Sequence, residues 1–85
     1  MSLKEQFEEA VAVSQSLPTR PGNETLLNLY SLYKQATFGD CSAEFTGNVF
    51  DIIGKAKYNA WKKHNGMTSD DAMKKYIAIV AELKG

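Results

Sequence analysis

Apolar residues recur at helical spacing in the first part of the chain. Ser2 is followed three positions later by Glu5, which is the capping-box pattern of a helix start. Apolar side chains then repeat every three or four positions until Pro18, where the run stops. This spacing predicts a first helix that extends to the proline. Its apolar face would consist of Leu3, Phe7, Ala10, Val11 and Leu17.

A second helical stretch follows the loop at residues 19–22. Asn23 is expected to be its N-cap, and Gly39 and Asp40 are expected to end it. Apolar residues surround much of its circumference, so we expect this helix to touch two neighbours, or one neighbour and a ligand. These residues are Leu26, Leu27, Leu29, Tyr30, Leu32, Tyr33 and Ala36.

Two further helices are predicted after an irregular stretch at residues 40–50. One would begin near Asp51 and run to His64, with Asn65 and Gly66 as its C-terminal stop. The other would start at a capping pattern made by Thr68 and Asp71. Its apolar stripe would consist of Met73, Tyr76, Ile77, Val80 and Leu83. Because no segment alternates with a period of two, the predicted fold class is all-α.

Length and composition predict one small domain spanning residues 1–85. The hydrophobic fraction of 44% is typical of globular chains and too high for disorder. No apolar run approaches the roughly 18 residues of a membrane span, and the N-terminus lacks the basic, then apolar, pattern of an export signal. One cysteine cannot form an internal disulfide, and one histidine with one cysteine argues against a structural zinc site. We therefore expect a cytoplasmic protein, and a monomer as the simplest state.

Charge is distributed unevenly, although the formal net charge is zero. Residues 1–51 hold three basic and seven acidic side chains, whereas residues 52–85 hold seven lysines and three acids. This asymmetry indicates a basic patch on an otherwise acidic body, and the alternative is a set of solvated faces without a role. Nucleic acid is not an expected partner, because there is no basic excess and no binding motif.

Three sequence blocks carry a resemblance to a known family. Residues 30–40 read YSLYKQATFGD, residues 54–61 read GKAKYNAW, and residues 69–83 read SDDAMKKYIAIVAEL. The order and spacing of these blocks resemble the acyl-CoA-binding protein family over nearly the whole chain. The resemblance implies a four-helix up-down-down-up bundle. It also implies a polar surface site for the CoA head group and an apolar groove beside it for the acyl chain.

The resemblance also implies a set of ligand-binding residues. Tyr30 would pack on the adenine and reach the phosphates, with Tyr33 and Lys34 in the same block. Lys57 would meet the 3′-phosphate, and Tyr76 would lie close to the nucleotide. By spacing alone, these tyrosines would be core residues with their hydroxyls at the surface, and the lysines a solvated face. The joint occurrence of the blocks favours the binding role.

The chain departs from the family pattern at four places. Phe45-Thr46-Gly47 stands where Arg-Pro-Gly is usual, and Ile53 replaces a lysine that often contacts phosphate. Gln15 replaces a basic residue of the first helix, and Tyr58 replaces a tryptophan. These differences bear on head-group affinity and on the loop conformation, and they leave the ligand class in place.

Physical chemistry supports the same ligand. CoA carries close to four negative charges, and lysine serves as a flexible point charge for phosphate. Lys34 lies one turn beyond Tyr30, so both can address one ligand. A tyrosine face suits an adenine ring, and base–aromatic stacking contributes roughly 1–3 kcal/mol.

The predicted function is an intracellular carrier and pool former for medium- to long-chain acyl-CoA, without catalysis and without a cofactor. No arrangement of Ser, Cys and His suggests an activated nucleophile, so no catalytic residue is predicted. Expected partners are fatty acyl-CoA and, transiently, acyl-CoA-using enzymes; stable membrane association is not expected. One alternative is a protein-interaction bundle that has lost the ligand, motivated by Ile53 and the altered loop. A free fatty-acid binder is the other.

Overall fold

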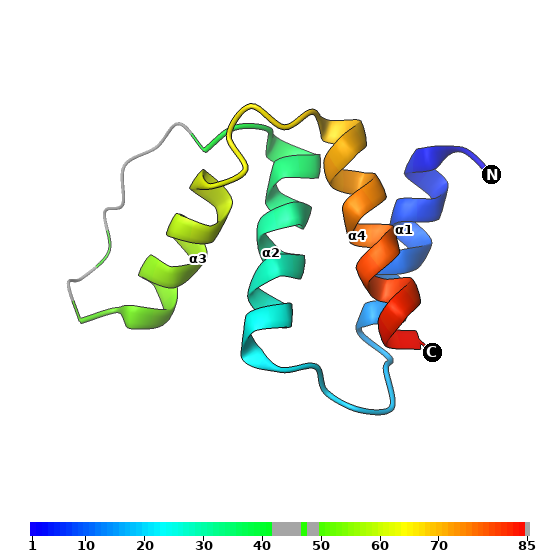
Figure 1. Ribbon diagram of the computed structural model, residues 1–85, viewed down its shortest axis with the longest axis horizontal. Helices are drawn as coiled ribbons and strands as arrows, with labels where there is room; N and C mark the ends of the chain where they lie inside the picture. Colours follow the sequence, from blue (N-terminus) through cyan, green and yellow to red (C-terminus); the bar gives the residue numbers. More distant parts are fainter. Residues whose placement is uncertain (42–46, 48–49, 85) are drawn as a thin grey trace.

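Four α-helices make up the regular structure of the chain in this computed structural model, which describes residues 1–41, 47 and 50–84. They are α1 (Leu3–Ser14), α2 (Asn23–Phe38), α3 (Ile52–Lys62) and α4 (Ser69–Lys84). The described residues contain no strand, so the predicted all-α class is confirmed. Figure 1 shows α1 and α4 running in one direction and α2 and α3 in the other, which confirms the up-down-down-up order.

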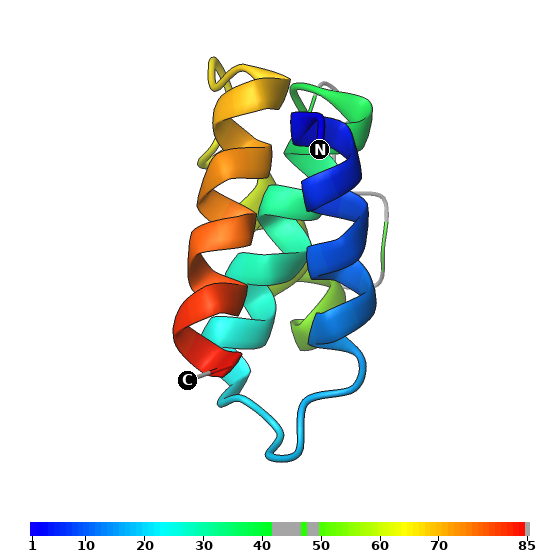
Figure 2. The same ribbon diagram turned by 90° about the vertical axis from the view of Figure 1, so that its right-hand side faces the viewer.

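The helices are arranged in the spatial order α3, α2, α4, α1 (Figure 1). Helix α2 packs against both α3 and α4, which is the first of the two arrangements expected from its apolar circumference. Helix α1 packs against α4, as Figure 2 shows from the side. As a result α1 and α3 lie at opposite ends of a molecule whose longest extent is 39 Å.

The hydrophobic core is formed by three of the four helices. Its buried side chains come from α1, α2 and α4, whereas α3 has no buried residue. These side chains are Phe7, Ala10, Leu29, Leu32, Ala36, Ala72, Tyr76 and Val80. Helix α3 therefore packs against α2 without contributing a side chain to the core.

Helix α1 is shorter than its apolar spacing predicts. It ends at Ser14, with Gln15 as its C-cap, and does not continue to Pro18. The Ser14 hydroxyl donates to the Val11 carbonyl at 2.7 Å, and the Ser16 hydroxyl donates to the Val13 carbonyl at 3.2 Å. Such local bonds compete with helix continuation, and the proline disfavours helical geometry in the residue before it.

The predicted start of α1 is confirmed by its capping box. The Ser2 hydroxyl accepts from the Glu5 backbone N–H at 3.1 Å, and the Glu5 carboxylate accepts from the Ser2 backbone N–H at 3.4 Å. At α4, the Thr68 hydroxyl accepts from the Asp71 backbone N–H at 3.1 Å. The start of α2 differs from the prediction, since Gly22 is the N-cap and Asn23 is the first helical residue.

Helix α3 begins where predicted and ends two residues early. The Asp51 carboxylate caps it by accepting from the Gly54 N–H at 2.9 Å. The helix ends at Lys62, and Lys63 is its C-cap, so that His64 lies just beyond it. Gly66 has φ = 93°, a left-handed conformation that favours glycine and turns the chain toward α4.

A buried glutamine ties the linker between α3 and α4 to α2. Gln35 is fully buried, and its Nε2 donates to the Asp40 carboxylate and to the Met67 carbonyl, both at 2.8 Å. The same Asp40 oxygen accepts from the Gly66 N–H at 2.8 Å. The hydrogen bonds from the Gly66 N–H and the Gln35 side chain hold the pKa of Asp40 below its ordinary value. The network fixes the linker between α3 and α4 to the end of α2.

His64 has a structural place in the same region. Its Nε2 lies 3.0 Å from the Ser31 hydroxyl, which itself donates to the Asn28 carbonyl at 2.9 Å. Because that hydroxyl proton is already engaged, the imidazole Nε2–H is the donor to Ser31. Burial, with further contributions from Lys75 and Lys63, lowers the pKa of His64 from its ordinary value. The folded structure therefore favours the neutral form of the His64 imidazole.

Candidate functional site

Two lysines from different helices converge on the ring of Tyr30. Lys34, one turn further along α2, places its Nζ 5.8 Å from the ring centroid. Lys57 reaches across from α3 and places its Nζ 5.1 Å from the same centroid. Both distances are within cation–π range. Three of the five predicted ligand residues thus form one cluster, which we call the lysine–tyrosine cluster (Tyr30, Lys34 and Lys57).

Further aromatic rings surround Lys34. Its Nζ lies 4.5 Å from the Phe38 ring centroid and 5.7 Å from that of Trp61. Trp61 also donates its Nε1–H to the Gly39 carbonyl at 2.9 Å, which holds α3 against the end of α2. Phe38, 67% exposed, was not singled out by the sequence. Its position one turn after Lys34 is the signal that could have found it.

The remaining two predicted tyrosines meet at Phe7 instead. The ring of Tyr33 stacks on Phe7 with centroids 6.0 Å apart, and Phe7 makes an edge contact with Tyr76 at 5.1 Å. The Tyr76 hydroxyl lies 3.0 Å from the Ser14 hydroxyl. Since Ser14 donates its proton to Val11, the tyrosine is the donor in this bond. Tyr76 is buried and engaged internally, whereas Tyr33 is exposed.

A groove lies beside these rings, between α1 and α2. Each of these helices packs on α4, and the space between them has a volume of about 410 Å³. Lys4 and Glu8 are its charged lining residues, and most of the others are apolar. The lining residues are Lys4, Phe7, Glu8, Val11, Tyr33, Ala36, Thr37 and Met73. Phe7, which the periodicity assigned to the core alone, therefore also lines the groove.

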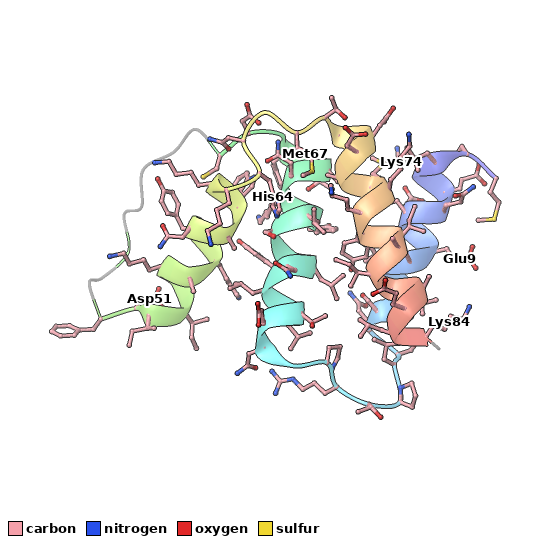
Figure 3. All side chains as sticks on the ribbon, viewed as in Figure 1. Glu9, Asp51, His64, Met67, Lys74 and Lys84 are labelled. Carbon is pink, nitrogen blue, oxygen red and sulfur yellow. The ribbon has the colours of Figure 1, made fainter. Side chains whose placement is uncertain are left out.

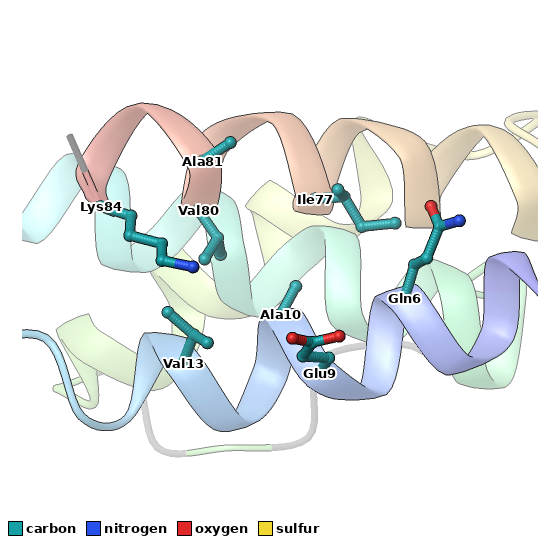
Figure 4. Close-up of a pocket in the computed structure, with 8 residues that line it drawn as sticks. All are labelled: Gln6, Glu9, Ala10, Val13, Ile77, Val80, Ala81 and Lys84. Atoms are coloured by element: carbon teal, nitrogen blue, oxygen red, sulfur yellow. The ribbon is translucent and has the colours of Figure 1, made fainter. Parts of the chain in front are cut away.

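A second hollow lies between α1 and α4, with a volume of about 210 Å³ (Figure 4). Its walls are largely Ala10, Val13, Ile77 and Val80. Its only charged lining residues are Glu9 and Lys84, so their charges offset each other. It is about half the size of the groove between α1 and α2 and has no excess of cations. It is less suited to a large anionic ligand.

Three of the four departures from the family pattern lie within the described residues. Ile53, one turn before Lys57 on α3, is 72% exposed. Gln15 is exposed and forms the C-cap of α1, while Tyr58 is half-buried with the Lys62 Nζ 5.7 Å from its ring centroid. The fourth departure, Phe45-Thr46, lies outside the described residues.

The chemistry of the cluster and groove is that of binding. The cluster presents two ammonium groups and aromatic faces, and the groove presents apolar walls. Within residues 1–41, 47 and 50–84, no group of three or more His, Cys, Asp or Glu side chains is placed to hold a metal ion. None of the helices in the same ranges is both long and apolar enough to cross a membrane.

Comparison with known proteins identifies what the chain resembles. The family model described as "Acyl CoA binding protein" matches residues 4–80. The acyl-CoA-binding protein homolog 1 of Caenorhabditis elegans is 47% identical over 77 residues, which cover 91% of this chain and 88% of that protein. The acyl-CoA-binding protein of Saccharomyces cerevisiae is 44% identical over 77 residues, covering 91% and 87%.

Solved structures agree with these sequence matches. The crystal structure of Oryza sativa acyl-CoA-binding protein 2 superposes with a TM-score of 0.88 at 38% identity, and the match covers 96% of this chain and 90% of that one. The crystal structure of the corresponding Moniliophthora perniciosa protein gives a TM-score of 0.87 at 38% identity, covering 98% and 80%. The likeness therefore extends over both the sequence and the three-dimensional arrangement of the helices.

Proposed function

This chain belongs to the acyl-CoA-binding protein family, and from that premise we propose that it is a single-domain carrier of medium- to long-chain fatty acyl-CoA esters. The observation that carries the proposal is the convergence of Lys34 and Lys57 on the ring of Tyr30 from two helices. A chain of zero net charge can hold a strongly anionic head group only where cations gather locally.

The lysine–tyrosine cluster is the proposed head-group site. The Tyr30 ring would receive the adenine, and the two ammonium groups that now lie near that ring would turn to the phosphates. Lys57 would meet the 3′-phosphate, because it approaches from α3 and can flank a nucleotide held against α2. The neighbouring rings of Phe38 and Trp61 limit the positions open to the Lys34 ammonium group, which lowers the entropic cost of binding.

The groove between α1 and α2 is the proposed site for apolar parts of the ligand. Phe7, Val11 and Met73 offer apolar contact surface there, and Tyr33 adds a ring at its edge. Tyr76 packs against Phe7, which lines the groove. We therefore propose that Tyr76 acts on the ligand through Phe7 and does not touch the nucleotide directly. Each buried methylene contributes about 0.8 kcal/mol, so a sixteen-carbon tail contributes on the order of 10 kcal/mol before entropic costs.

The proposed carrier does no chemistry on the thioester and uses no cofactor. It keeps acyl-CoA in solution, shields the thioester from water, and passes the ester to acyl-CoA-using enzymes through short-lived encounters. We place it in the cytoplasm, where Cys41 would remain a reduced thiol, and we propose that it acts as a monomer.

Calorimetric titration tests this proposal directly. Palmitoyl-CoA, acetyl-CoA, CoA and palmitate are titrated separately into the protein, below the micelle concentration of the lipid. We expect tight one-to-one binding of palmitoyl-CoA, and much weaker binding of acetyl-CoA, CoA and palmitate. Equal affinity for acetyl-CoA and palmitoyl-CoA would contradict the apolar groove. Hydrolysis of palmitoyl-CoA by the pure protein would contradict a carrier without catalysis.

A protein-interaction bundle without a ligand is the second candidate, favoured by one observation. Ile53 is 72% exposed next to the cluster, at the position where the family often has a phosphate-binding lysine. The two candidates differ in their response to Lys34→Ala and Lys57→Ala. For a carrier, both variants lose acyl-CoA affinity while the helical content and melting temperature stay at parental values. For an interaction bundle, the unsubstituted protein itself does not bind acyl-CoA.

A further inference from the structure

A third hollow lies between α2 and α4, with a volume of about 330 Å³. None of its described lining residues comes from α1. Figure 3 shows His64, one of these residues, next to α2. We call the lining set the α2–α4 hollow, and it consists of Asn28 and Leu32 of α2, His64 of the linker, and Lys75, Ala78 and Ile79 of α4.

The α2–α4 hollow is separate from the proposed ligand site. Asn28 and Leu32 are one turn apart, so they share one side of α2. Tyr30 and Lys34 follow them by two residues each, which places them about 200° further round the helix. The hollow also shares no lining residue with the groove between α1 and α2. An occupant of the hollow would therefore lie across α2 from the lysine–tyrosine cluster.

Positive charge in this hollow is not balanced by a lining carboxylate. The groove between α1 and α2 has Lys4 together with Glu8, and the hollow between α1 and α4 has Lys84 together with Glu9. The α2–α4 hollow has Lys75, and none of its described lining residues is acidic. An anionic partner group is therefore what this hollow lacks and the other two already contain.

The surroundings of His64 show the same imbalance. Besides burial, the groups that lower the pKa of His64 are the cations Lys75 and Lys63. On the α2 side, the imidazole meets the Ser31 hydroxyl, which carries no charge. A carboxylate placed beside His64 would be attracted by both lysines and would offset their effect on the ring.

The bottom of the hollow is apolar and small. Leu32 is 3% exposed, and Ala78 and Ile79 add aliphatic surface beside it. A volume of about 330 Å³ is at the lower end of the range for small-molecule sites, so the hollow encloses too little of a free ligand to offset the entropy lost on binding. A protein segment can place one side chain there and make further contacts outside. The hollow therefore suits an aliphatic side chain that is flanked by carboxylates.

We propose that the α2–α4 hollow docks an acidic segment of a partner protein. An aliphatic side chain of that segment enters the hollow over Leu32 and Ile79, while carboxylates on either side of it contact the ammonium groups of Lys75 and Lys63. An interface of this size is weak and exchanges rapidly. It suits a partner that meets the protein briefly, on the side of α2 away from the proposed head-group site. The proposal goes beyond acyl-CoA binding and does not rest on it.

The test uses a synthetic acidic peptide and no acyl-CoA. A short capped peptide with a central leucine between glutamates is titrated into isotope-labelled protein at low salt, and backbone amide shifts are followed by NMR. One comparison peptide has serine in place of the leucine, and another has lysines in place of the glutamates. The protein variants are Lys75→Gln and Ala78→Glu, both at exposed positions. The matched control is Lys74→Gln, at the neighbouring exposed lysine of α4 that does not line the hollow (Figure 3).

We expect saturable shifts around Leu32, His64 and Ile79, and weaker binding as salt is raised. The serine peptide should bind about tenfold more weakly or worse, because it loses the buried aliphatic side chain. Lys75→Gln should weaken binding about fivefold, and Lys74→Gln less than about twofold. Ala78→Glu should abolish binding, as should the lysine peptide. Melting curves establish that each variant is folded.

Several results would overturn the proposal. These are no binding to the unsubstituted protein, equal losses in Lys74→Gln and Lys75→Gln, and shifts that centre on Tyr30 and Lys34, since the peptide would then imitate the CoA head group. Hexanoate and phosphatidylserine vesicles are titrated in parallel. If either shifts the same amides as strongly as the peptide does, the occupant is a small anion or a lipid surface, and the proposal of a protein partner is wrong.

Discussion

The ammonium group of Lys57 lies 5.1 Å from the ring centroid of Tyr30, so a side chain of α3 reaches a ring on α2. Among the described residues, no other pair of helices brings a predicted ligand cation to a predicted ligand ring. The contact spans the interface between the core helices and the one helix that contributes nothing to the core. If the lysine–tyrosine cluster is the head-group site, as we propose, ligand binding depends on how α3 is held against α2.

Removing the charge of Lys57 should weaken acyl-CoA binding. A hydrogen bond to a charged group contributes about 1.5–3 kcal/mol, so Lys57→Met should reduce affinity for palmitoyl-CoA by about 10- to 100-fold. Calorimetry at low and high salt measures the loss, which should shrink as salt screens the charge. Lys55→Met, on the opposite side of the same helix, is the matched control. Equal losses in both variants would assign the effect to the overall charge of α3.

The ring of Tyr30 should matter more than its hydroxyl. Tyr30→Leu removes the stacking surface, and we expect a loss of about 1–3 kcal/mol in binding free energy. Tyr30→Phe keeps the ring and should retain most of the affinity. Titration of both variants with CoA alone isolates the head-group contribution. If Phe and Leu lose affinity equally, the hydroxyl rather than the stacked face carries the contribution.

Local sequence patterns predicted the starts of the helices well because capping acts over a few residues. The capping box at Ser2 and the Thr68 cap of α4 are of this kind. The predicted stop of α3 at Gly66 was late, since the helix ends at Lys62. The end of α1 at Ser14 could not be found in this way. The Ser14 hydroxyl donates to the Val11 carbonyl there, and apolar spacing does not predict such a side-chain hydrogen bond. Apolar spacing reports only where the hydrophobic face continues.

The site was predictable only in part from chemistry within one helix. Tyr30 and Lys34 share a helix, so their spacing alone places them together. Lys57 comes from α3, and its approach depends on helix packing, which spacing does not report; the family resemblance supplied that pairing. Tyr33 lies on the same helix as Tyr30 but contacts Phe7 of α1, whereas Tyr30 faces Lys57 of α3. Spacing along one helix does not tell which neighbouring helix each ring meets.

Replacing Gln35 should destabilise the fold. Its Nε2 holds the Met67 carbonyl and the Asp40 carboxylate, and its Oε1 has no hydrogen-bond partner in the described part of the chain. Gln35→Ala leaves a cavity and unpaired groups, so we expect a loss of about 2–4 kcal/mol in the free energy of unfolding, measured by urea denaturation. Asn59→Ala, at an exposed position on α3, should cost less than about 0.5 kcal/mol. A loss at Gln35 no larger than that of the control would mean that the network does not hold the linker.

Stability should fall on mild acidification because of His64. Its pKa in the folded protein lies below the ordinary value of 6.5, since burial and the neighbouring Lys75 and Lys63 disfavour the charged ring. The unfolded chain therefore takes up the proton first as pH falls through 6.5, and the folded state loses stability until pH reaches the lowered pKa. Asp40 does not titrate in this window, because its pKa is held below 3.8.

Urea midpoints at pH 7.5 and 5.5 measure this effect. The parent should have the lower midpoint at pH 5.5, and His64→Gln, which cannot titrate, should show a smaller difference between the two values. An unchanged difference in the variant would assign the acid sensitivity to another group.

Within the described part of the chain, helix α3 contributes no buried side chain and, of the other helices, packs only on α2. Its backbone amides should accordingly exchange with deuterium through local openings long before those of α4, which require the core to come apart. A ligand held between Tyr30 and Lys57 adds the contact that α3 otherwise lacks, so loading should slow exchange chiefly in α3. The empty and the loaded protein would then differ in how often α3 opens, so that ligand binding changes the local stability of one helix and leaves that of the core helices nearly unchanged.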